Sequence, residues 1–84
     1  MMGMLWFDND PKTTVEQKVA KALKHHVTRF GRDAEIIVMN LKNVEGVDLD
    51  QLSKSCNVII KVARYVTTQH MIVGFEEQAM ELRV

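Results

Sequence analysis

The sequence TTVEQKVAKALKHHVTRFG at residues 13–31 predicts one amphipathic helix, and the rest of the chain supplies strands for it to cover. Side chains expected in the core recur every three or four residues along it, which is the spacing of a single helix face. They are Val15, Val19, Leu23, His26 and Phe30, with Ala22 and Val27 beside them. The opposite side is polar and mainly basic, so we expect it to face water.

Both ends of this helix carry sequence signals. Thr13 and Glu16 have the spacing of a capping box, in which each side chain accepts a hydrogen bond from a free backbone N–H of the first turn. Pro11 disfavours an earlier start. Gly31 suits the left-handed conformation that closes a helix, and Arg29 lies where the helix dipole favours a cation.

Length and composition indicate one globular domain at residues 1–84, because a chain of 84 residues buries a single modest core. Hydrophobic residues make up 46% and charged residues 26%, which is typical of a globular chain. The lone cysteine, Cys56, rules out an internal disulfide and favours a cytoplasmic protein. Residues 1–7 lack the basic region and the length of a signal peptide, so we expect neither a leader nor a membrane anchor.

Shorter segments complete the expected fold. Residues 4–8 predict a strand, and residues 34–40 predict a second one that is apolar in succession and therefore buried on both faces. The first strand, the long helix and the second strand would form a βαβ unit with a right-handed crossover. Asp48 or Asp50 is placed to cap a short helix at 49–55.

The end of the chain alternates in polarity and predicts a hairpin. Its strands are expected at residues 57–64 and 70–76, followed by a helical tail at 77–84. The predicted fold is therefore α+β, a small α/β arrangement in which one long amphipathic helix packs on a mixed sheet of about three to four strands.

Three parts of the chain resemble a set of short uncharacterised bacterial proteins. These parts are the opening LWFDNDPKT at residues 5–13, the Gly31–Arg32 step, and a late group made of Arg64, His70, Gly74, Glu76 and Glu77. The middle of the chain, residues 40–56, departs from the pattern. The resemblance implies a compact domain of helix and strands, and it carries over no functional residue.

Two groups of residues are candidates for chemistry. Asp8, Asn9 and Asp10 offer oxygen ligands for Mg²⁺ or Ca²⁺, but Pro11 interrupts the pattern of a calcium loop, and a turn closed by its own side chains explains the tract as well. The second group consists of His25, His26, His70 and Cys56. Their spacing matches no zinc template, and no residue is marked to orient a cysteine nucleophile. We therefore assign no catalytic, cofactor-binding or metal-binding residue and expect no enzyme activity.

Charge is balanced in number but uneven in position. The chain has 11 basic and 11 acidic residues, yet six basic ones gather around the long helix, where Glu16 is the only acidic residue. The six are Lys12, Lys18, Lys21, Lys24, Arg29 and Arg32. Such a face can lie along phosphates, so weak nucleic-acid binding is the alternative function. A solvated helix face is the preferred interpretation, because the net charge is zero and no aromatic residues lie between these lysines.

Counting apolar faces predicts self-association. One helix covers one side of a sheet, whereas the strands predicted at 34–40, 57–64 and 70–76 carry apolar residues on both sides. Soluble monomers rarely leave so large a patch in water, and two-fold dimers are the commonest oligomers. We therefore expect a small non-enzymatic binding or assembly module that forms a homodimer, in which two sheets meet face to face or edge to edge and Trp6 and Phe7 contribute to the contact. The alternative is a monomer whose tail at 77–84 folds back and completes the core.

Overall fold

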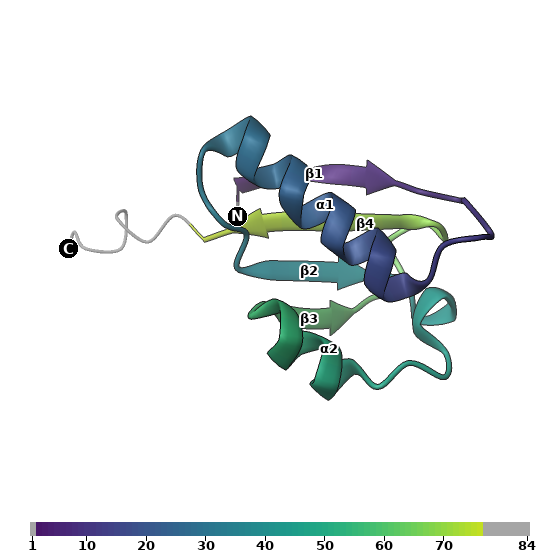
Figure 1. Ribbon diagram of the computed structural model, residues 1–84. Coiled ribbons are helices and arrows are strands. Elements are labelled where there is room, and N and C mark those ends of the chain that lie inside the picture. The colour runs from purple at the N-terminus through teal and green to yellow at the C-terminus, as the bar shows by residue number, and fades with distance from the viewer. Residues whose placement is uncertain (1, 77–84) are drawn as a thin grey trace.

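The computed structural model describes residues 2–76, so the helical tail predicted at 77–84 lies outside the described residues. Along the chain it contains β1 (Met2–Phe7), α1 (Val15–Phe30), β2 (Ile36–Met39), the 3-10 turn η1 (Leu41–Val44), α2 (Leu49–Cys56), β3 (Ile59–Val62) and β4 (His70–Phe75) (Figure 1). The α+β class is confirmed, with α2 as a second helix on the sheet beside α1.

The four strands form one mixed sheet in the order β1-β4-β2-β3. β4 is antiparallel to both of its neighbours, and β2 is parallel to β3. It follows that β1 and β2 run in the same direction with β4 inserted between them. The predicted βαβ unit is therefore present in a split form.

The predicted hairpin of residues 57–64 and 70–76 is wrong, because β3 pairs with β2 and not with β4. The connection after β3 crosses the end of β2 and is held there by Asn40, whose side-chain N–H donates to the Val66 carbonyl over 2.7 Å. The burial of the two strands explains why β4, and not β3, lies inside the sheet. β4 is largely buried and takes a central place, whereas β3, which is mostly exposed, takes an edge.

The start of α1 differs from the prediction by one residue. The cap is Thr14, whose hydroxyl accepts from the Gln17 N–H at 3.1 Å, while the Gln17 side chain accepts from the Thr14 N–H at 2.9 Å. Thr13 instead donates its hydroxyl proton to the Asp10 carbonyl of the preceding turn. The other end is confirmed: Gly31 has φ 71°, and its N–H donates to the Val27 carbonyl.

The predicted face of α1 is the one that meets the sheet. Val19, Ala22 and His26 are fully buried, while Leu23 is half-buried and Val27 is exposed. The line of closest contact thus runs along Ala22 rather than Leu23, because a small side chain lets the helix approach the strands.

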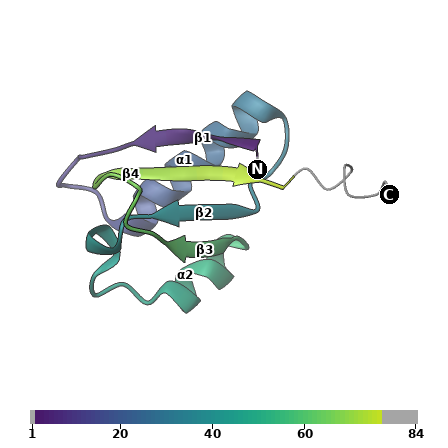
Figure 2. The same ribbon diagram turned by 180° about the vertical axis from the view of Figure 1, so that it is seen from behind.

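α2 packs on the same side of the sheet as α1. Its cap is Asp48, which accepts from the Gln51 N–H, and it ends at Asn57 in the left-handed conformation. Leu52 is buried in the core cluster that also contains Val19 and Ile37. Both crossovers, β1 to β2 and β2 to β3, step across the sheet in the same direction. With the usual right-handed connection, both helices therefore lie on one face (Figures 1 and 2).

Strand β2 is buried on both faces, as expected from its sequence. Ile37 lies at the centre of the core under the helices and is fully buried. On the opposite face, Ile36 and Val38 form a smaller cluster with Val66 from the connection before β4. This loop covers part of the sheet face that the two helices leave open.

We expect Ile37→Ala to lower the free energy of unfolding by about 2 to 5 kcal/mol, because it leaves a cavity in the middle of the core. The matched control is Ile59→Ala, which removes the same atoms from a side chain that is 58% exposed and should cost about 0.5 kcal/mol or less. Chemical denaturation measures both. Equal losses would contradict the inward orientation of Ile37 and the outward orientation of Ile59.

Candidate protein-binding surface

The candidate site is the face of the sheet opposite the two helices, which we call the open face (Figure 2). Strand alternation and the pairing register place one set of side chains on it. These belong to Leu5 and Phe7 of β1, His70 and Ile72 of β4, Ile36 and Val38 of β2, and Ile59 and Lys61 of β3, together with Gly3 and Gly74. The set is mostly apolar.

Cover on the open face is uneven. Ile36 and Val38 are buried at its centre beneath Val66. Leu5 is 65% exposed and Phe7 is 55% exposed on β1, at one edge of the sheet. Among the described residues, Phe7 contacts a single ring, that of His70, with centroids 4.7 Å apart. Ile59 on β3, at the opposite edge, is 58% exposed. Exposed apolar side chains therefore lie at both edges of the open face, and β1 carries two of these three.

The outer edge of β1 is not paired with any other strand of residues 2–76. The N–H of Asp8 donates to the Gln69 carbonyl in the same ladder that joins β1 to β4. Since backbone groups alternate in an antiparallel pair, those of Gly3, Leu5 and Phe7 point away from β4. Within the described residues no hydrogen bond reaches them. An exposed edge of this kind is a template for another strand.

Gly3 approaches the neighbouring strand more closely than any other residue type allows. It stands opposite Gly74 in the register, and a Cβ on it would lie 2.5 Å from the carbonyl oxygen of Val73. This contact was not predicted from the sequence. A glycine in a strand indicates that another group approaches closely, but it does not identify that group.

Trp6 and Phe7 lie on opposite faces of the sheet, so only one of the two aromatic residues expected at a contact is on the open face. Trp6 packs against the core cluster under the helices, and its ring centroid lies 5.0 Å from that of His25. Phe7 remains on the open face. The prediction placed both rings at the same contact, but adjacent residues of a strand point to opposite faces of the sheet.

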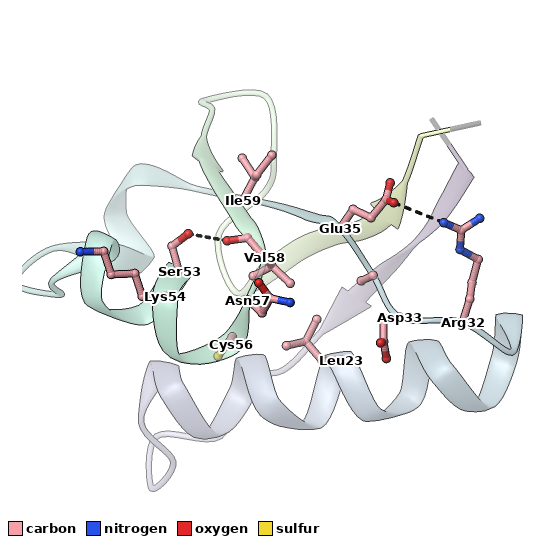
Figure 3. A pocket seen from close by; sticks show the side chains of 11 residues that line it. Leu23, Arg32, Asp33, Glu35, Ser53, Lys54, Cys56, Asn57, Val58 and Ile59 are labelled. Carbon is pink, nitrogen blue, oxygen red and sulfur yellow. Dashed lines mark hydrogen bonds and ion pairs between the residues drawn. The ribbon is translucent and has the colours of Figure 1, made fainter. Parts of the chain in front are cut away.

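A hollow of about 760 Å³ lies on the helical side, between α1, α2 and the starts of β2 and β3 (Figure 3). Its polar groups are largely engaged with one another. Arg32 pairs with Glu35 at 3.3 Å, and the Ser53 hydroxyl donates to the Val58 carbonyl. Glu35 also accepts from the backbone N–H of Glu76. Of the charged side chains in the hollow, Arg32 and Glu35 pair with each other, whereas Asp33 and Lys54 form no ion pair with another described residue.

The aspartates of the first loop act as turn residues. One oxygen of Asp8 accepts from the Asp10 N–H at 3.0 Å, and one oxygen of Asp10 accepts from the Lys12 N–H at 2.9 Å. These bonds are those of side chains that close their own backbone turn. In residues 2–76, no three histidine, cysteine, aspartate or glutamate side chains gather as a metal site would require.

The histidines are divided by the sheet. His70 lies on the open face beside Phe7, whereas His25 and His26 belong to α1 on the other side. His70 bonds the Thr68 carbonyl of its own loop. Cys56 is half-buried at the end of α2, in the wall of the hollow. The candidate zinc ligands therefore come from different layers of the fold.

His26 has a structural place in the core. Its Nδ1 lies 3.0 Å from the Arg32 carbonyl oxygen, which only accepts, so Nδ1 carries the proton. The ring packs against Phe30 and Phe75, with centroids 4.6 and 5.7 Å away. No described residue offers Nε2 a hydrogen bond. This imidazole ties the end of α1 to the turn that leads into β2.

We expect His26→Ala to destabilise the fold by about 1 to 3 kcal/mol, through the lost hydrogen bond and the lost ring packing. His25→Ala is the matched control, because that neighbouring side chain is exposed and loses one ring contact, with Trp6, so it should cost about 1 kcal/mol or less. Thermal and chemical unfolding of the two variants test this. A larger loss for His25→Ala would contradict the assignment.

Basic side chains line the outer surface of α1. Lys21, Lys24 and Arg29 are exposed, and Lys18 is half-buried. None of the three lysines forms an ion pair with another described residue, whereas the Arg32 guanidinium lies 4.0 Å from the centroid of the Phe75 ring. The basic face predicted from the sequence is thus present on α1, on the side of the molecule opposite the open face.

Comparison of the chain with protein-family models, with curated proteins and with solved structures finds no match. Neither helix in residues 2–76 combines the length and the apolar content that a membrane span requires.

Proposed function

We propose that this protein is a small assembly module, without enzyme chemistry of its own, that binds a second copy of itself through the β1 side of its sheet. The observation that carries the proposal is the exposed pair Leu5 and Phe7 beside a strand edge that no described residue pairs. Contiguous apolar surface on a small protein commonly marks a protein contact.

The layer arrangement supports this proposal. Both helices cover the same face, and the loop carrying Val66 covers only the centre of the other. The basic surface of α1 would repel a copy of itself, whereas β1, MGMLWF, is uncharged and meets its own copy without such repulsion. The cost of leaving Leu5 and Phe7 in water is therefore removed most simply by a second chain at β1.

Sedimentation equilibrium at micromolar concentration should give a mass near twice the 9.6 kDa of one chain. Phe7→Lys should shift the protein to the monomer, because it places a charge in the contact. Ala20→Lys is the control, since it adds the same charge at an exposed position of α1 and should leave the mass unchanged. A mass near that of one chain for the unaltered protein would refute the assembly proposal.

A second candidate function is nucleic-acid association through the outer face of α1. Lys18, Lys21 and Lys24 recur every three residues there and have no ion-pair partner among the described residues. Phosphate neutralisation by such a row gives weak binding that falls with salt. The same face lies away from β1, so the two functions use separate surfaces.

Fluorescence anisotropy should give dissociation constants of about 10⁻⁴ to 10⁻⁶ M at physiological salt and tighter binding at low salt, with little sequence preference. Replacing Lys18, Lys21 and Lys24 by glutamate should abolish this binding. The matched control makes the same charge change at Lys42, Lys54 and Lys61, which lie outside α1, and should retain more of it. Nanomolar binding lost only in the α1 variant would place nucleic acid first.

A further inference from the structure

We infer that the two copies join β1 to β1 in antiparallel order, with the two-fold axis at Leu5, so that their sheets become one continuous sheet. This inference rests on the proposed assembly function and specifies its contact. It excludes a dimer in which two open faces stack on each other. Three features carry it: the edge of β1, its register and the side chains that the register brings together.

The edge of β1 is the better of the two sheet edges for pairing. It offers six residues, MGMLWF, without lysine, proline or any charge. The other edge, β3, has four residues and includes Lys61. Lysine on an edge strand is a common device against pairing, and β1 has none.

The hydrogen-bonding pattern selects the register. The free backbone groups of β1 belong to Gly3, Leu5 and Phe7, and a two-fold pairing must match such residues with each other. An axis at Leu5 pairs Leu5 with its own copy and Gly3 with Phe7 of the second copy. The backbone groups of all three residues then pair with residues that lie inside β1 of the second copy. Axes nearer either end pair one of them with a residue beyond Met2–Phe7.

The side chains agree with this register. On the open face, Phe7 of each copy would lie across from Gly3, which has no side chain and admits no Cβ. An aromatic ring across from a glycine is a known stabilising pair in antiparallel strands. Leu5 would meet Leu5 at the axis. On the helical face, Trp6 would lie across from Met4, so that no charged side chain of β1 enters the contact.

Cysteine cross-linking tests the axis directly. In a Cys56→Ser background, Leu5→Cys should form an intermolecular disulfide on oxidation with copper phenanthroline, because directly opposed residues of this kind have Cα atoms about 5.5 Å apart. Ile59→Cys is the control, since Ile59 is nearly as exposed as Leu5 but lies on the opposite edge. Equal cross-linking of both variants would overturn the inference.

Proline substitution tests the backbone pairing. Leu5→Pro removes an N–H that β4 does not use, so circular dichroism should show an unchanged fold while dimerisation weakens by about 30-fold or more. Leu5→Thr keeps that N–H and should weaken dimerisation less. If Leu5→Pro remains dimeric and Phe7→Lys does not, the β1 pairing is wrong and the assembly proposal stands. If the unaltered protein is monomeric, both fail.

Discussion

The direction of the two parallel crossovers decides the architecture of this protein. β1 connects to β2 and β2 connects to β3, and both steps go the same way across the sheet. Because such connections are right-handed, both helices must cover the same face. The short α2, which supplies Leu52 to the common core, is therefore not available to the other side. An apolar strand such as β2, buried on both faces, then needs cover that the helices cannot provide.

β4 completes the sheet and sets its edges. By entering between β1 and β2, it places its buried residues Met71, Val73 and Phe75 in the centre and leaves β1 and β3 outside. The apolar content of β1 would suit a central strand, and that mismatch between composition and position is the physical basis of the proposed contact. The exposed fractions of Leu5 and Phe7 follow from the place of β4.

Local features of this fold were predictable from the sequence because they depend on neighbouring residues. The spacing of Val19 and Ala22, the Gly31 cap, and the burial of β2 on both faces all belong to this class. The choice between Thr13 and Thr14 as the cap was not, because two adjacent threonines each have an acceptor three residues on, and the Asp10 turn engages the first of them. Strand pairing was not predictable either, since alternation cannot distinguish a hairpin from two strands that pair on opposite sides of β2. Counting apolar faces predicted an exposed patch on the strands at 34–40, 57–64 and 70–76, but the loop carrying Val66 buries Ile36 and Val38 at its centre. The exposed side chains of β1 lie at an edge that this count did not identify.

The close approach of Gly3 to Val73 links the inside of the sheet to its outer edge. The carbonyl oxygen of Val73 occupies the space that a side chain at position 3 would need, so glycine is required by the pairing of β1 with β4. On the open face no side chain stands at that point, because Gly3 pairs with Gly74. Phe7 stands four residues along the same strand, on the same face and more than half exposed. In the proposed β1 pairing, the two-fold axis at Leu5 would bring the Phe7 ring of each chain opposite Gly3 of the other. The requirement for glycine at position 3 within one chain would then also provide the position that Phe7 of the proposed second copy occupies.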